Sequence, residues 1–214
     1  MSTIRLNNVI PEIFAHNTDV NSDVWRKEIS LEQGKKYLIE AASGTGKSSL
    51  CSYIYGLRSD YQGQILFDGQ DVSKFSINKW CDIRQSTISI LFQDLRLFGE
   101  LTALENVQIK HRLHKLHNNK VIKGWFDQLG IADKMDTRID HMSYGQQQRV
   151  ALIRSLCQPF EFLILDEPIS HLDDYNSDVM RDILLCEVER QGAGLIITSI
   201  GKHMNIEYDK ILSL

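Results

Sequence analysis

The segment KYLIEAASGTGKSSLCSYIYGL constrains the fold of this chain more than any other stretch. Apolar residues 36–42 predict a buried strand, and residues 47–57 predict the helix after it. The turn between them matches the phosphate-binding pattern G-x-x-x-x-G-K-[ST] except at the first position, where Ala41 replaces glycine. Gly44 and Gly46 let backbone N–H groups face an anion, and the helix points its positive N-terminus at the same place. The segment therefore predicts a nucleotide-phosphate site in an α/β protein.

Two side chains at the end of this turn have the chemistry that a nucleoside triphosphate requires. Lys47 is placed to reach the outer phosphates, and the hydroxyl of Ser48 is placed to bind Mg²⁺. The alternative is a plain glycine- and serine-rich turn that carries a lysine by chance. The residues expected to contact the nucleotide form one run: Ser43, Gly44, Thr45, Gly46, Lys47, Ser48 and Ser49.

A second element of the site is the segment FEFLILDEP at residues 160–168. A short apolar strand ends there in two acids. Asp166 would reach the coordination sphere of Mg²⁺, and Glu167 would polarise an attacking water. The alternative is a strand that ends in two solvated acids, but the phosphate-binding loop upstream favours the catalytic interpretation.

Strands and helices alternate along the rest of the chain, which indicates a mainly parallel sheet covered on both faces. Residues from about 94 to 145 have helical spacing and many charges, so we expect an inserted α-helical subdomain there. Further strands are expected at 63–70, 86–93, 194–199 and 208–214, and further helices at 145–157 and 174–191.

Composition and charge exclude several classes of protein. The 214 residues carry a net charge of −4, which disfavours nonspecific nucleic-acid binding because that requires a basic surface to displace counterions. No apolar run approaches the roughly 20 residues that span a bilayer. The cysteines lack metal-binding spacing, and we expect reduced, mostly buried thiols in a cytosolic protein. They are Cys51, Cys81, Cys157 and Cys186.

The motif MSYGQQQRVALIRSL at residues 142–156 resembles the signature of ABC ATPases, whose core is L-S-G-G-Q followed by a helix. Gln93 in LFQD matches the Q-loop of that family, and SHLD at residues 170–173 matches its D-loop. Over essentially its whole length the chain is similar to an ABC transporter nucleotide-binding subunit. Residues 91–107 most resemble the subfamily that serves lipoprotein release and macrolide export.

The resemblance implies a fold and an assembly. The fold is an α/β P-loop NTPase in which residues 1–214 form a single ABC ATPase domain, with a mainly parallel sheet, an N-terminal antiparallel β subdomain and the inserted helical subdomain. Two chains, as a homodimer or with a paired ABC subunit, sandwich two molecules of ATP with Mg²⁺. An integral membrane transporter subunit is the implied partner and nucleic acid is not, so the chain is expected in the cytoplasm, peripheral on the inner face of the cell membrane.

The resemblance also assigns roles to residues. The signature residues expected near the γ-phosphate of the partner's nucleotide are Ser143, Gly145 and Gln146. The residues expected to hold Mg²⁺ are Ser48, Gln93 and Asp166. The residues expected to be catalytic are Lys47, Gln93, Glu167 and Ser199. Asp173 would couple the two sites, and an N-terminal aromatic ring would stack on adenine. Phe14 is preferred to Tyr37 for that ring, because LNNVIPEIF occupies the matching segment.

Three residues depart from the family pattern. Ala41 is the smallest replacement for glycine and should be mild. Tyr144 replaces the first signature glycine; it keeps the backbone N–H, and its added ring could pack on the partner's loop or on the nucleotide. We expect binding to survive, because Ser143 and Gly145 remain. Ser199 stands where the family has a switch histidine, and a serine has shorter reach and no positive charge. His203, four residues on, is the other candidate for that role, although a plain surface histidine is the simpler interpretation.

These departures leave more than one function open. The first is an ATPase that drives a transporter, and Ser199 predicts that it is intrinsically slow or depends on a partner for its full rate. The second is a regulatory ABC ATPase that transports nothing, and the third is a degenerate module that binds ATP and dimerises.

Trp80 and Trp125 are expected in packing rather than in ligand contacts. The histidines that recur every third residue are expected on a solvated basic face: His111, His114 and His117.

Overall fold

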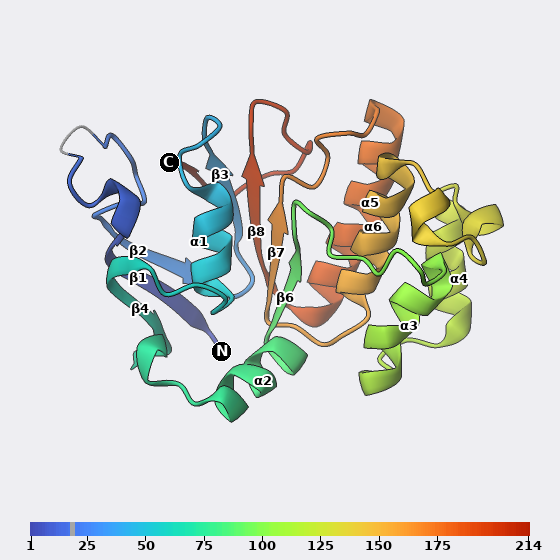
Figure 1. Ribbon diagram of the computed structural model, residues 1–214, viewed down its shortest axis with the longest axis horizontal. Coiled ribbons are helices and arrows are strands. Elements are labelled where there is room, and N and C mark those ends of the chain that lie inside the picture. Colours follow the sequence, from blue (N-terminus) through green and yellow to red (C-terminus); the bar gives the residue numbers. More distant parts are fainter. Residues whose placement is uncertain (18–19) are drawn as a thin grey trace.

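The computed structural model describes residues 1–17 and 20–214. Two sheets and two groups of helices follow one another as layers across the molecule (Figure 1). A small sheet from the N-terminal part of the chain lies at one side, helix α1 stands between it and a second sheet, and the remaining long helices cover the far side. This is the α/β arrangement that the alternation of strands and helices predicts.

The small sheet is antiparallel, with the strand order β2-β1-β4-β5. Its strands are β1 (Thr3–Pro11), β2 (Glu28–Glu32), β4 (Tyr61–Phe67) and β5 (Gln70–Asp71). In β1 the side chains of Ile4 and Leu6 are buried and that of Arg5 between them is exposed, as in a sheet with one face on the core. This sheet is the N-terminal antiparallel subdomain that the family resemblance implies.

The larger sheet is parallel throughout, with the strand order β6-β7-β8-β3-β9. Its strands are β3 (Lys36–Glu40), β6 (Ile88–Leu91), β7 (Phe162–Asp166), β8 (Gly194–Ser199) and β9 (Lys210–Ser213). Every residue of β7 and β8 is buried. Parallel strands covered on both faces have this continuous apolar character, so the mainly parallel sheet expected from the sequence is confirmed.

Six α-helices occur in the part of the chain that the structure describes. They are α1 (Lys47–Ile54), α2 (Ile77–Ser86), α3 (Ala103–His114), α4 (Asn119–Gln128), α5 (Tyr144–Leu156) and α6 (Asp174–Gln191). Short 3₁₀ turns span Glu12–Phe14, Val72–Lys74, Ala132–Lys134 and Ile139–His141. Helices α3 and α4 are the inserted helical segment between β6 and α5. Over residues 1–17 and 20–214, the structure has no helix of the length and apolar character that crossing a membrane requires.

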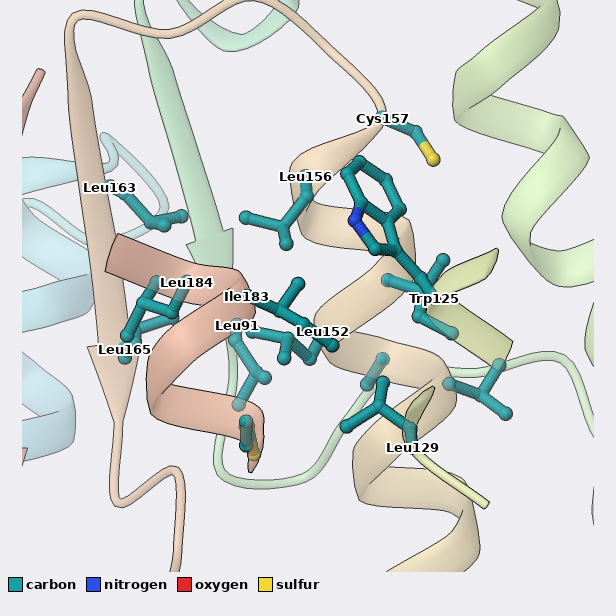
Figure 2. Packing of buried hydrophobic residues seen from close by; sticks show 14 of the residues in the cluster. Leu91, Trp125, Leu129, Leu152, Leu156, Cys157, Leu163, Leu165, Ile183 and Leu184 are labelled. Atoms are coloured by element: carbon teal, nitrogen blue, oxygen red, sulfur yellow. The ribbon is translucent and has the colours of Figure 1, made fainter. Parts of the chain in front are cut away.

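The two faces of the parallel sheet carry two separate hydrophobic cores. In β7 the side chains of Leu163 and Leu165 belong to the core under α5 and α6, whereas Phe162 and Ile164 belong to the core under α1. This alternation follows from the two-residue period of a strand. Figure 2 shows the first core, where the strand residues meet side chains from three helices. The helix residues labelled there are Trp125, Leu152, Leu156, Ile183 and Leu184, and Leu129 directly follows α4.

Most elements lie where the sequence places them, but α2 was not predicted. Helix α6 and strand β8 span the predicted residues, and the other predicted strands and helices differ at their ends by a few residues. Helix α2 begins after Ser76, whose side chain accepts a hydrogen bond from the N–H of Lys79. Ile83 is its one buried residue, although Ile77, Trp80 and Cys81 have the helical spacing that could have indicated the helix.

The expected solvated basic face is wrong for two of its three histidines. His111 is buried, and only 6% of the His117 side chain is exposed. The Nε2 atom of His117 lies 3.2 Å from Oε1 of Glu187 on α6, and its ring meets the ring of Trp125 edge-on at 4.7 Å. The loop after α3 is therefore attached to α6 by a buried polar contact that the local spacing does not reveal. Both Trp80 and Trp125 pack against aromatic neighbours, as expected.

The cysteines divide evenly between buried and exposed positions, which corrects the expectation of mostly buried thiols. Cys51 and Cys157 are buried, whereas Cys81 and Cys186 are exposed. Burial raises the pKa of Cys157 to about 12 and that of Cys51 well above its ordinary value. These two side chains therefore remain neutral thiols at physiological pH.

Glu187 is a buried carboxylate on α6, and its charge is expected to affect the free energy of unfolding. Burial alone would raise its pKa, but the contact with His117 and the hydrogen bonds from Arg190 and Gln191 outweigh burial and lower the pKa below its ordinary value. Its contribution to stability is therefore present at neutral pH and is lost as the pH falls through the lowered pKa.

We predict that Glu187→Gln lowers the free energy of unfolding at pH 7 by about 2 kcal/mol, because charge-assisted hydrogen bonds are lost. The difference from wild type should shrink as the pH falls below the ordinary carboxyl pKa. Urea unfolding at several pH values measures both effects. The matched control is Glu189→Gln, an exposed position on the same helix. A pH-independent difference, or one equal to that of the control, would contradict the assignment.

Candidate nucleotide-binding site

The carboxyl ends of β3, β7 and β8 meet at one edge of the parallel sheet. The strand register places Glu40 beside Ser199, and Asp166 beside Thr198. The loops that follow these strands leave the sheet at that edge, at the top of Figure 1. Ligands of open parallel sheets bind outside the carboxyl ends of the strands, so this edge is the candidate site.

Lys47 is the central charge of the site, and only 5% of it is exposed. Its Nζ atom donates a 2.8 Å hydrogen bond to the carbonyl of Ala42 and lies 3.6 Å from Oε1 of Glu167. A buried ammonium group requires such compensation. The hydroxyl of Thr45 also donates to the carbonyl of Ala42, at 2.9 Å. The loop thus encloses the lysine and brings it to the acid pair.

Gly46 makes the turn from the loop into α1. Its φ of +102° lies in the left-handed region, and a Cβ atom there would lie 3.0 Å from the ring of Trp25. The Nε1 atom of Trp25 donates to the carbonyl of Thr45 at 3.0 Å. Gly46, at the cap position of α1, offers no capping side chain, and the first turn of α1 contains no acid. The N–H groups of that turn are therefore available to an anion.

Phe14 lies beside this loop, and Tyr37 does not. Phe14 lines a cavity of about 330 Å³ together with Trp25, Gly44 and Thr45. Tyr37 is 4% exposed, and its hydroxyl accepts a hydrogen bond from the N–H of Glu32 in the antiparallel sheet. Of the two candidate aromatic rings, the structure brings Phe14 to the phosphate-binding loop.

The acid pair is held in a constrained geometry. The hydroxyl of Thr198 donates to Oδ1 of Asp166 at 2.6 Å. Glu167 has a φ of +52°, a left-handed conformation that costs a side-chain-bearing residue of the order of 1 kcal/mol or more. Hydrogen bonds hold it there: its N–H donates to the carbonyl of Thr198, and its carbonyl accepts from Nε2 of Gln148. Such strain occurs mainly where function requires it.

The predicted Q-loop lies against the phosphate-binding loop, and the signature lies against the Q-loop and the D-loop segment. The hydroxyl of Ser48 donates to Oε1 of Gln93 at 3.2 Å, which joins the two segments. Ser143 and Gln146 form a capping box at the start of α5, where each side chain bonds the backbone N–H of the other. A Cβ atom on Gly145 would lie 3.4 Å from the carbonyl of His171, so the signature packs closely against the D-loop segment of its own chain.

Tyr144 contacts the Q-loop and the D-loop segment of its own chain. Its hydroxyl donates a 2.6 Å hydrogen bond to the carbonyl of Gln93 in the same chain. Its ring lies 4.5 Å from the ring of His171. This contact forms because a tyrosine side chain at the first turn of α5 is long enough to reach the Q-loop. A glycine at the same position would make no such contact.

The loop after β8 places its polar side chains in three different environments. Ser199 is 5% exposed, and its hydroxyl donates to the carbonyl of Lys202. The Nε2 atom of His203 lies 2.8 Å from Oε1 of Glu40, so this histidine faces β3. Lys202 donates a 2.8 Å hydrogen bond to the carbonyl of Leu172. The cation that contacts the D-loop segment is therefore Lys202, which sequence reasoning did not single out.

Two further residues of the site were missed. Thr198 orients both acids, and Trp25 holds the turn of the phosphate-binding loop. Placing β7 beside β8 in parallel register would have revealed Thr198, since residue 198 is then opposite Asp166. Trp25 has no comparable local signal, because it reaches the loop from a distant part of the chain.

A glycine-rich loop between a parallel strand and a helix, with a buried lysine facing an acid pair, defines a P-loop NTPase. The family model described as "ABC transporter" matches residues 26–170. The chain therefore belongs to the ABC transporter family, and it has the fold of that family's ATP-binding domain.

Several relatives whose names describe different transport systems resemble this chain. A macrolide export ATP-binding/permease protein of Shewanella sp. (strain ANA-3) is 30% identical over 87% of the chain, which spans 29% of that protein. A thiamine import ATP-binding protein of Vibrio parahaemolyticus is 32% identical over 86% of the chain and 76% of its own length. A lipoprotein-releasing system ATP-binding protein of Rhodopseudomonas palustris is 29% identical, with coverages of 87% and 82%.

Solved structures support the same fold. A dimeric bacterial ABC transporter cassette matches with a TM-score of 0.77 at 22% identity, covering 92% of this chain and 87% of the cassette. A bacterial ABC exporter with ATP bound matches with a TM-score of 0.79 at 21% identity, covering 100% of this chain and 37% of the exporter.

We predict that Gly46→Ala lowers the affinity for nucleotide by roughly 5- to 150-fold. The new Cβ atom combines an unfavourable φ with contacts to Trp25 and Phe14, and such a misfit costs of the order of 1–3 kcal/mol. Gly34→Ala is the matched control, because Gly34 has a φ of +78° with open space around it. Equal loss of nucleotide affinity in the two variants would contradict a specific role for Gly46.

Proposed function

We propose that this chain is the ATP-binding and ATP-hydrolysing subunit of an ABC transporter, which closes as a dimer around two molecules of Mg-ATP and drives a separate membrane subunit. The observation that carries the proposal is the buried contact between Lys47 and Glu167, which joins the phosphate-binding loop to the acid pair. A triphosphate on the loop would place its outer phosphate where these two side chains meet. Phe14 is the proposed ring for the adenine base.

The donor set beside Lys47 suits Mg²⁺. Ser48 offers a hydroxyl oxygen, Gln93 an amide oxygen 3.2 Å away, and Asp166 a buried carboxylate. Oxygen ligands of these types are the ones that Mg²⁺ prefers, with waters and phosphate completing its shell. When bound, the ion supplies charge neutralisation at the phosphates. We assign Ser48, Gln93 and Asp166 to hold it.

The chain's own side chains have distinct tasks in hydrolysis. N–H groups of the loop and of the first turn of α1 bind phosphate oxygens. Lys47 neutralises charge on the outer phosphates, and Glu167 accepts a hydrogen bond from the attacking water and orients it. The hydrogen bonds that fix the backbone of Glu167 set the direction of its carboxylate. Orientation of this kind lowers the barrier because it is established before the reaction.

Closure by two chains would complete each site. We assign Ser143, Gly145 and Gln146 to the γ-phosphate bound by the partner chain, because they lie at the positive N-terminus of α5. Asp173, at the start of α6, would couple the two sites. A membrane subunit that docks on the helical segment and the Q-loop would place the chain at the cytoplasmic face of the membrane. The relatives with transport in their names support this assignment.

A slow or non-turnover cassette is the second candidate function. The hydroxyl of Ser199 is already engaged by the carbonyl of Lys202, and His203 is paired with Glu40. The position that holds the switch histidine in the family therefore provides no charged donor for the γ-phosphate. Loss of one such donor costs about 3 kcal/mol of transition-state stabilisation, or roughly a hundredfold in rate.

We predict that wild-type protein hydrolyses ATP slowly and that Ser199→His raises turnover by up to about a hundredfold. Steady-state phosphate release from purified protein measures this. Adding Glu167→Gln to either background should abolish the signal and so show that it comes from this site. No rate gain in Ser199→His would contradict the role of position 199. A wild type that binds ATP but releases no phosphate would favour the degenerate module.

A further inference from the structure

Tyr144 holds the Q-loop from a position where the family signature has glycine. The hydroxyl donates to the carbonyl of Gln93 at 2.6 Å, and the ring is flanked by His171.

Gln93 accepts two hydrogen bonds, one on its backbone and one on its side chain. Its backbone carbonyl accepts from Tyr144, while its side-chain Oε1 accepts from the hydroxyl of Ser48. One contact comes from the signature helix and the other from the phosphate-binding loop. The backbone contact restricts where the side chain can point, so the two hydrogen bonds are coupled through a single residue.

The rest of the Q-loop requires support of this kind. Leu95 and Arg96 have φ values of +57° and +47°, both left-handed. Arg154, near the far end of α5, donates to the carbonyls of both residues, at 2.6 Å and 2.7 Å. Helix α5 thus holds the loop at both of its ends, through Tyr144 at its first turn and Arg154 at its last. Of these two contacts, the one from Tyr144 reaches the residue that faces the phosphate-binding loop.

We infer that Tyr144 is a positioning residue that aims the amide oxygen of Gln93 at the Mg²⁺ position beside Ser48. This inference rests on the proposed function, because it concerns the same Mg-ATP site. It also makes α5 a direct mechanical connection, within one chain, between the signature and the metal ligands. A shift of α5 during closure would move Gln93 relative to Ser48.

The test is Tyr144→Phe, which removes one oxygen atom and keeps the ring against His171. Binding of a non-hydrolysable fluorescent ATP analogue is measured in EDTA and across a Mg²⁺ titration. In the variant, the gain in affinity that Mg²⁺ provides should fall about fivefold, the size of one hydrogen bond, while the affinity in EDTA stays unchanged. Amide hydrogen exchange over residues 93–96 of the nucleotide-free protein should become faster.

Tyr175→Phe is the matched control, because Tyr175 is exposed at the start of α6. It should leave Mg²⁺ dependence and exchange unchanged. Wild-type Mg²⁺ dependence in Tyr144→Phe would overturn the inference, whatever the exchange rates show. An equal loss of affinity in EDTA and in Mg²⁺ would also overturn it, since that outcome reports general damage to the site. Failure of the wild type to bind the analogue in either condition would instead overturn the proposed function.

Discussion

The ion pair between Lys47 and Glu167 is the interaction on which the rest of the site depends. An ammonium group this deeply buried is tolerated only beside a carboxylate and carbonyl oxygens, and the structure provides both. Meeting that requirement brings β3 and β7 to a common edge, with β8 between them. It also explains the strained backbone of Glu167, which is held by Thr198 on one side and Gln148 on the other.

Two cores on opposite faces of one sheet give the site its rigid base and its connection to the helical segment. The face under α1 fixes the phosphate-binding loop, and the face under α5 and α6 fixes the signature and the D-loop. Figure 2 shows how the core under α5 and α6 joins α4, α5 and α6 to β7. Helix α5 links the core to the site, since its buried side packs on the sheet and its first turn reaches the Q-loop.

Local patterns predicted the parts of the structure that depend on local physics. The apolar strands, the glycine-rich turn and the helix over Asp174–Gln191 follow from periodicity and turn chemistry. Helix α2 was missed although Ile77, Trp80 and Cys81 have helical spacing, and Ile83 is its one buried residue. The contacts of His117 with Glu187 and of Tyr144 with Gln93 were missed because each joins residues more than 50 positions apart. Spacing within one helix contains no information about a partner on another.

The central claim is that this cassette works on a membrane partner when ATP closes it. The most direct test is to recover tagged Glu167→Gln protein from detergent-solubilised membranes of its own host in the presence of Mg-ATP, with Lys47→Ala as a bait that should not hold nucleotide. The account predicts that a membrane protein with several spans co-elutes in stoichiometric amount with the first bait and not with the second. A Glu167→Gln bait that elutes alone, or with soluble proteins only, would contradict it.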